Sequence, residues 1–194
     1  MKHYFLLLFL LTGFGYCYSQ TTVPGYYVTN TNDTIKAQIK IPKSVWGSDD
    51  LSKFFNKVEV VDNSNNTKKF KPEDIRSYGF LYNDKQYLFF SKPTISINNL
   101  KFLQPIIRGQ KTSLYYFDTV NQNGARMGTF YTLEKTDGTY IFLISATRLS
   151  KYRNELKDFY KDNTTVQQLI DTKFQSKTSI ESDLIKIVEA VNKL

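Results

Sequence analysis

Alternation of apolar and polar residues dominates the first two thirds of the chain. In residues 35–41, isoleucine and alanine alternate with lysine and glutamine, which is the period of a strand with one buried face. The turn pair Asn32-Asp33 separates this run from Tyr26–Val28, so the sequence predicts a β-hairpin. Pro42 follows the second strand and ends its pairing.

Further strands follow at short intervals and are joined by polar turns. The segments "KVEVVD" and "TKKF" flank the turn "NSNN", and "SYGFLY" and "QYLFF" flank Asn83-Asp84. Asp137-Gly138 is the strongest hairpin signal in the chain. Beyond residue 100, the expected strands cover 101–108, 112–118, 129–135 and 139–144. These connections are too short for parallel crossovers, so we predict a mainly antiparallel sheet.

After Ser145 the apolar spacing becomes helical. The first helix places the following residues on one face: Leu149, Tyr152, Leu156, Phe159 and Tyr160. Thr164-x-x-Gln167 and Thr178-x-x-Glu181 have the form of capping boxes and predict two more helix starts. Strands first and helices last indicate an α+β fold. We expect residues 20–146 to form a strongly curved antiparallel sheet or partial barrel, and residues 147–194 to form about three helices that pack on the same domain.

The chain begins with a segment typical of export. Residues Tyr4–Phe14 form an apolar run behind Lys2, too short to span a bilayer and followed at once by polar residues. Residues 1–19 are therefore interpreted as a signal peptide. This predicts an exported protein, periplasmic, associated with the outer membrane or extracellular, whose mature chain has no transmembrane span.

The cleavage site involves the chain's only cysteine. Cys17 and Ser19 are small residues at the −3 and −1 positions of a typical cleavage site, which makes Gln20 the first mature residue. Tyr16 is too large for the position before a lipid-anchor cysteine, but lipidation of Cys17 stays open as an alternative. Cleavage also removes His3, the only histidine.

The basic composition changes this picture little. The formal net charge is +8, and 15% of the residues are aromatic, which suits a β-rich core. Arginine, the preferred reader of phosphates and bases, is scarce beside lysine, and the lysines are scattered over strands and helices. We therefore expect no nucleic-acid partner.

The mature chain lacks the residues of several common mechanisms. Without histidine and cysteine it excludes Ser-His-Asp and Cys-His catalysis and the usual zinc sites. Gly124–Gly128 has no phosphate-binding lysine and is predicted to be a hairpin loop. Asp62–Glu73 resembles a calcium loop in spacing only, because Thr67 replaces the required glycine, and is also predicted to be a hairpin turn. We expect no catalytic residue, cofactor or metal site.

Paired carboxylates leave one enzymatic alternative, a carboxylate hydrolase. The candidates are Asp49-Asp50, Glu73-Asp74, Asp84 and Asp118. Such an enzyme needs two carboxyl groups about 5–10 Å apart in one cleft. Acidic pairs in turns are more often caps or solvated charges.

Four segments resemble uncharacterised exported proteins common in Bacteroidota. They are "PGYYVTNTNDTIKAQI", "KKFKPEDIRSYGF", "ELKDFYKDNTTVQQLIDTKF" and "DLIKIVEAVN". Asn163 stands where those proteins often have a cysteine, and Val191-Asn192 where they have Tyr-Asn. The resemblance implies an N-terminal β-meander, C-terminal helices and an envelope location, and it carries no assigned activity. Exported proteins of that phylum are often O-glycosylated at Asp-(Ser/Thr)-hydrophobic sequences, which nominates Thr34 and Thr119.

Clustered aromatic residues supply the remaining functional candidates. On a strand, neighbouring side chains point to opposite faces, so each cluster exposes some of its rings. The candidate contact residues are Tyr26, Trp46, Tyr115, Arg126 and Tyr131. We expect a non-enzymatic exported protein that binds another envelope protein. The alternative is a binder of an amphiphile (a lipid) or glycan within the curved sheet, and a lined cavity in that sheet would favour it.

Overall fold

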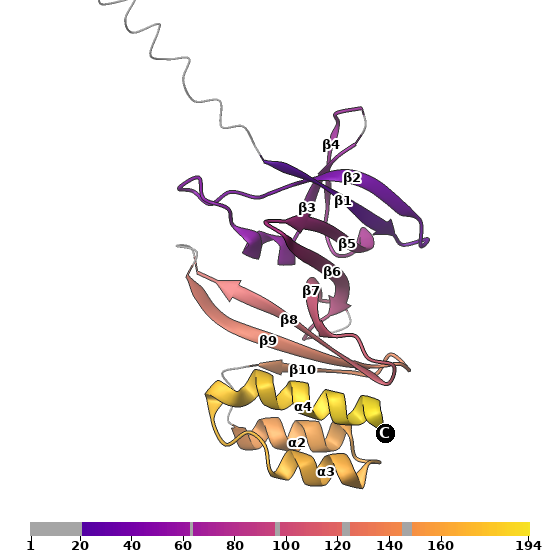
Figure 1. The fold of residues 1–194 in the computed structure, drawn as a ribbon, viewed down its shortest axis with the longest axis vertical. Coiled ribbons are helices and arrows are strands. Elements are labelled where there is room, and N and C mark those ends of the chain that lie inside the picture. The colour runs from indigo at the N-terminus through magenta and orange to yellow at the C-terminus, as the bar shows by residue number, and fades with distance from the viewer. Residues whose placement is uncertain (1–20, 63, 96–97, 122–124, 145–148) are drawn as a thin grey trace, which may run out of the picture.

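A computed structural model describes residues 21–62, 64–95, 98–121, 125–144 and 149–194. The predicted signal peptide, the Cys17 alternative and the expected boundary at residue 146 lie outside these ranges. Within them the fold is α+β, with an antiparallel sheet followed by helices (Figure 1).

The described strands form one ten-stranded sheet in the order β10-β9-β8-β7-β6-β5-β1-β2-β3-β4. The strands are β1 (Thr22–Thr29), β2 (Thr34–Lys40), β3 (Val58–Val61), β4 (Thr67–Phe70), β5 (Ile75–Tyr82), β6 (Lys85–Pro93), β7 (Leu100–Ile107), β8 (Thr112–Val120), β9 (Arg126–Lys135) and β10 (Tyr140–Ile144). The helices are η1 (Leu51–Phe55), α2 (Leu149–Phe159), α3 (Thr164–Asp171), η2 (Lys177–Ser179) and α4 (Ile180–Lys193). Each predicted hairpin is confirmed, including the one formed by β3 and β4 where the calcium-like spacing lies.

The predicted helix caps are wrong in detail. The N-cap of α3 is Asn163, whose side-chain oxygen accepts the Val166 N–H at 3.0 Å. The side chain of Gln167 instead donates to the Lys157 carbonyl at 2.6 Å and so ties α3 to α2. α4 follows directly on η2 and has no side-chain cap.

The prediction of a strongly curved sheet or partial barrel is also wrong. The sheet is open and not strongly curled, with β10 and β4 as its edges. The physical reason is that the chain builds two hydrophobic clusters instead of one enclosed interior. Each cluster is covered by its own elements, so neither needs the sheet to close.

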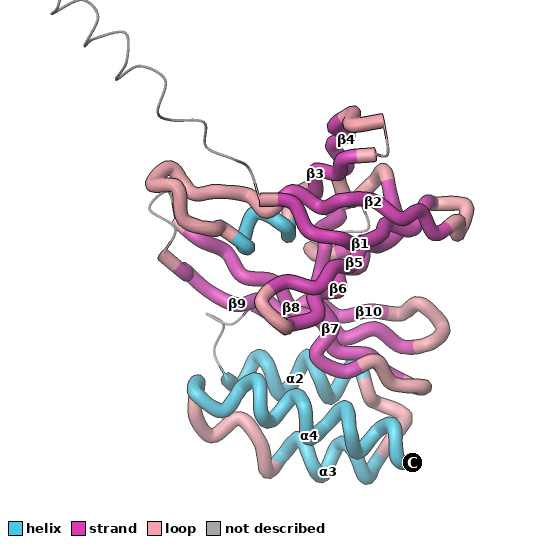
Figure 2. Tube along the Cα trace, turned by 45° about the horizontal axis from the view of Figure 1, so that its top comes forward, coloured by secondary structure: helices cyan, strands magenta, loops and turns pink. Residues whose placement is uncertain are grey.

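The first cluster lies between the helices and one face of β8–β10. Leu114, Leu133 and Leu143 of the sheet pack there against helical residues such as Leu156 and Leu184. Figure 2 shows the three helices side by side in a layer beyond this end of the sheet. Among the described helices, none is long and apolar enough to cross a membrane.

The second cluster lies among the N-terminal strands, η1 and the opposite face of β8. Tyr78 is fully buried there, stacks on Phe89 with ring centroids 4.7 Å apart, and donates its hydroxyl to the Phe54 carbonyl at 2.7 Å. Burial raises the pKa of Tyr78 well above its usual value. Tyr115 and Phe117 of β8 complete this cluster.

Asn192 fastens the last helix to the turn before β8. Its side-chain oxygen accepts the N–H groups of Lys111 and Thr112 at 2.9 and 3.0 Å, and its side-chain nitrogen donates to the Thr112 carbonyl at 2.9 Å. A Cβ on Gly109 would lie 2.0 Å from that nitrogen, so only glycine allows the close approach.

We predict that Asn192→Ala lowers the free energy of unfolding by about 2–3 kcal/mol, because it removes three hydrogen bonds and strands their backbone partners. Chemical denaturation followed by circular dichroism measures the change. Lys193→Ala, on the neighbouring exposed residue, should change the stability by less than about 0.5 kcal/mol. Equal effects of the two variants would contradict the role given to Asn192.

Candidate functional site

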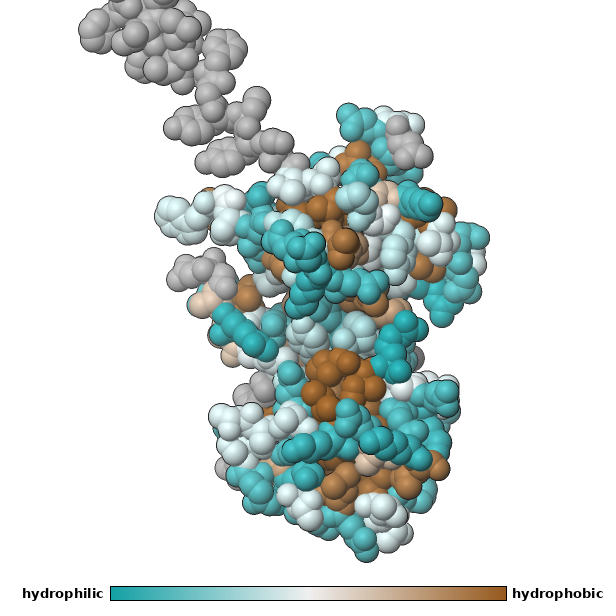
Figure 3. Space-filling view, viewed as in Figure 1, coloured by the Kyte–Doolittle hydropathy of each residue, from teal (hydrophilic) through white to brown (hydrophobic). Residues whose placement is uncertain are grey.

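The most exposed apolar side chains of the described chain lie between β2 and η1. Val45 and Trp46 are each 91% exposed. They occupy the tip of residues 43–49, called the Trp46 loop below. In the space-filling view this segment forms a finger that stands clear of the body of the molecule (Figure 3).

The Trp46 loop is a tight hairpin-like turn. Lys43 and Asp49 form an isolated β-bridge at its base. Ser44 donates its N–H to the Ser48 carbonyl at 2.7 Å, and the two hydroxyls lie 2.7 Å apart. Gly47 has a φ of +82°, a left-handed conformation that glycine adopts without strain. The turn therefore holds its two apolar side chains outward in a defined geometry.

A charged brace anchors the base of the loop to the sheet. The Lys43 ammonium lies 2.5 Å from an Asp49 carboxylate oxygen, and the Tyr82 hydroxyl of β5 donates to the other oxygen. The bonds from Lys43 and Tyr82 lower the pKa of Asp49, and the one from Asp49 raises the pKa of Tyr82. Lys53 of η1 donates to the Lys43 carbonyl at 2.5 Å.

The exposure of Val45 and Trp46 contributes nothing to the stability of the fold. A single exposed apolar residue is ordinary, but a fully exposed tryptophan beside a valine on a braced turn is not. Burying a tryptophan of about 150–250 Å² against a partner contributes about 4–6 kcal/mol at ~25 cal/mol per Å². The loop thus presents two apolar side chains to solvent.

A small basic pocket adjoins the base of the loop, where Lys53 contacts Lys43. Its volume is about 180 Å³, and its lining consists of Lys40, Pro42, Lys53, Phe54, Lys57 and Glu59. Lys40 belongs to β2 and Lys53 to η1, and Lys57 directly precedes β3. Of the described residues, none forms a hydrogen bond or ion pair with the side-chain ammonium of Lys40.

Two ammonium groups lie near each other at the edge of this pocket. Lys57 stands beside Lys69 of β4, and this basic neighbour lowers the pKa of Lys69. The carboxylates nearest to these lysines are Glu59, 3.6 Å from Lys57, and Asp50, 3.6 Å from Lys53. The surroundings of the Trp46 loop therefore carry excess positive charge. Sequence reasoning missed this grouping, because the lysines come from separate parts of the chain and share no local motif.

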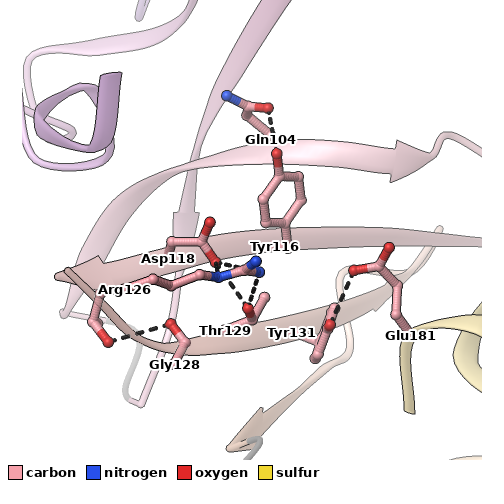
Figure 4. Close-up of polar contacts among 9 residues, drawn as sticks. Gln104, Tyr116, Asp118, Arg126, Gly128, Thr129, Tyr131 and Glu181 are labelled. Atoms are coloured by element: carbon pink, nitrogen blue, oxygen red, sulfur yellow. Dashed lines mark hydrogen bonds and ion pairs between the residues drawn. The ribbon is translucent and has the colours of Figure 1, made fainter. Parts of the chain in front are cut away.

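Two of the predicted contact residues are buried. Tyr115 is 5% exposed and packs against Phe90, with centroids 6.0 Å apart. Tyr131 is also buried and donates its hydroxyl to Glu181 of α4 at 3.0 Å (Figure 4). Burial is the main reason that the pKa of Tyr131 is raised. Both residues serve the packing of the sheet against its covering layers.

Arg126 is exposed but internally paired. Its guanidinium lies 2.8 Å from the Asp118 carboxylate and also donates to Thr129, as Figure 4 shows. Thr129 donates to the same Asp118 oxygen at 2.8 Å. This network joins β8 to β9 near the end of their hairpin.

The other predicted residues lie on the N-terminal strands or on β8. Tyr26 is half-buried, and its hydroxyl lies over Gly79. Thr34 is exposed at the start of β2. Thr119 is half-buried and donates its hydroxyl to the Gly128 carbonyl at 3.3 Å. Of the two proposed modification sites, Thr34 offers the more accessible hydroxyl.

Four of the candidate carboxylates have local roles. Asp49 and Asp118 are held by the basic residues named above, Asp50 accepts the Ser52 hydroxyl at 2.5 Å, and Asp74 accepts the Lys71 N–H at 2.7 Å. Within the ranges that the structure describes, no three acidic, histidine or cysteine side chains lie close enough to hold a metal ion.

A larger groove of about 430 Å³ lies beside Phe90 on β6 and includes Asn32, Glu73 and Arg76. The Arg108 guanidinium stands 4.9 Å over the Phe90 ring, and Tyr115 meets the same ring edge-on. The aromatic surface that a sugar would stack on is therefore already occupied.

Comparison with known proteins identifies no relative. No protein-family model, curated protein or solved structure matches the chain.

We predict that the fluorescence of Trp46 is that of an indole ring fully exposed to water. It is the only tryptophan, so the fluorescence of the protein is the fluorescence of this loop. In dilute solution the emission should match that of a free tryptophan amide, and acrylamide should quench it nearly as efficiently. Trp46→Ala should alter the free energy of unfolding by less than about 0.5 kcal/mol. A blue-shifted, quencher-protected indole would show that the loop is covered.

We predict that the loop loosens in acid. The pKa of Asp49 is lowered in the folded protein, so the brace is complete above the pKa of an unperturbed aspartate, about 4, and is lost as the pH falls below it. The anisotropy of Trp46 fluorescence should be constant from neutral pH down to about 4 and then decrease. Asp49→Ala should show the low value throughout. Far-UV circular dichroism on the same samples distinguishes release of the loop from unfolding of the protein. If Asp49→Ala has the same anisotropy as the unchanged protein at neutral pH, the brace does not hold the loop.

Proposed function

We propose that this protein is a non-enzymatic binding module of the bacterial envelope that engages another envelope protein through the Trp46 loop. The observation that carries the proposal is the braced turn with Val45 and Trp46 at its tip, both 91% exposed. Tryptophan is the residue most enriched at the centre of protein interfaces, where one buried side chain supplies much of the affinity.

A protein partner is favoured over a small ligand by the way the interior is filled. Both hydrophobic clusters are packed with fully buried side chains, including Tyr78, Phe89 and Tyr152. The pocket and groove described above are open and lie at the surface, and the groove's ring is covered by Arg108. A lipid or glycan within the sheet would require a lined cavity instead.

The charge around the loop indicates the chemistry of the partner surface. Lys40, Lys53, Lys57 and Lys69 outnumber the acidic residues beside them. A partner that offers an apolar pocket bordered by carboxylates would complement both features. The C-terminal end of β8 and the N-terminal end of β9 lie on the same side as the loop in both Figures 1 and 2, and Met127 near the start of β9 is exposed. It extends the surface that such a partner would contact.

The predicted signal peptide supports an envelope partner. The apolar run behind Lys2 and the small residues before Gln20 have the pattern of a signal peptide. The absence of histidine and cysteine from residues 20–194 removes the commonest catalytic bases and nucleophiles.

The test is photo-crosslinking in cells of the source organism. A benzophenone amino acid at position 46 should give one dominant adduct, and the same amino acid at Ile95, another strongly exposed apolar position, should not. The double variant Lys57→Glu/Lys69→Glu should abolish the adduct. Once the partner is purified, Trp46→Ala should weaken binding at least about 30-fold, the equivalent of ~2 kcal/mol. Identical adduct patterns at positions 46 and 95, or affinity unaffected by Trp46→Ala, would exclude the loop as the binding element.

A further inference from the structure

The two edges of the sheet differ in how they are protected. An unpaired edge strand offers free backbone groups to other chains, and proteins guard such edges with charges, prolines or bulges. At β4 the exposed Lys68 and Lys69 supply that guard. At the other edge, β10 reads Tyr-Ile-Phe-Leu-Ile, with no charge and no proline. Of the described strands, only β9 pairs with it.

The hydrogen-bond alternation shows which backbone groups of β10 face outward. In the turn, Lys135 donates its N–H to the Thr139 carbonyl at 2.8 Å. Since hydrogen-bonded and non-hydrogen-bonded pairs alternate along an antiparallel ladder, Ile141 and Leu143 bond to β9. The N–H and C=O groups of Tyr140, Phe142 and Ile144 therefore point to the free edge.

A row of stacked rings runs across the sheet to that edge. Phe117 on β8 stacks on Phe130 of β9 with centroids 5.0 Å apart, and Phe130 stacks on Phe142 of β10 at 5.6 Å. The interplanar angles are only 12° and 10°. The stack stops at Phe142, which is half-buried, while Ile144 beside it is 40% exposed.

We propose that β10 pairs with β10 of a second copy of this chain, antiparallel about a two-fold axis at Phe142. Phe142 then lies opposite its own symmetry mate, with both backbone hydrogen bonds formed between them, and Tyr140 lies opposite Ile144 in the same way. Opposed residues of an antiparallel pair share a face, so the ring stack of one chain continues directly into that of the other.

Three features favour a second copy over an unrelated strand. The residues whose backbone groups face outward lie symmetrically about Phe142, so two antiparallel copies of the strand can form hydrogen bonds with each other. All of its opposed pairs are apolar, so no charge is buried at the axis. The two-fold axis also completes the row of rings, which an arbitrary strand would not. The contact is a single pair of five-residue strands, so the dimer is expected to be reversible and concentration-dependent.

The test is a charge swap across the axis, read by sedimentation velocity over a range of concentrations. The unchanged protein should move from monomer toward dimer as its concentration rises. Phe142→Lys and Phe142→Glu should each remain monomeric, because like charges meet at the axis, and an equimolar mixture of the two should recover the dimer. Leu81→Lys, the same change at an exposed residue of β5, should leave dimerisation unaffected.

Circular dichroism establishes that each variant is folded. If the Phe142 variants are not, Ile144→Lys provides the same test at a more exposed position, with dimerisation weakened at least about tenfold. A protein that stays monomeric at every concentration would overturn the proposal and leave the edge to a strand of another protein. A dimer that survives the Phe142 or Ile144 changes would overturn it equally. None of these outcomes depends on the Trp46 loop.

Discussion

Strand β8 is buried on both faces, and the arrangement of every other layer follows from that constraint. Leu114 points into the cluster beneath the helices, whereas its neighbour Tyr115 and then Phe117 point into the cluster of the N-terminal strands. A strand buried on both sides needs a covering layer on each. The C-terminal helices supply one, and η1 with the N-terminal strands supplies the other. The sheet stays open because its two faces are covered by different layers at different places along the sheet.

The secondary structure was largely predictable, because it is encoded locally. Two-residue alternation marked the strands and helical spacing marked the helices, and both survive in the structure within a few residues. Sheet closure was not predictable, since it depends on which elements cover which face. The cap of α3 was misassigned for a related reason: Gln167 is engaged by α2, a tertiary contact that the sequence does not display.

For the candidate site, the sequence could predict which residue takes part but not its surroundings. Trp46 was named as a candidate contact residue, but the brace of its loop includes a contact between Asp49 and Tyr82, which are far apart in the chain. Tyr115 and Tyr131 had an equal claim from the sequence, and the structure buries them, because alternation does not reveal whether an outward face is covered by another layer. The basic pocket is likewise the product of folding, which brings together Lys40, Lys53 and Lys57 from separate parts of the chain.

The division of the interior into two clusters also bears on how the protein denatures. The helical layer and the N-terminal strands share β8 but bury largely different side chains, so one can open while the other keeps its packing. The two units would then lose their packing under different conditions, and a single melting temperature would not describe the molecule. The Trp46 loop belongs to the unit without the long helices, and its geometry is therefore insulated from fluctuations at the C-terminal end.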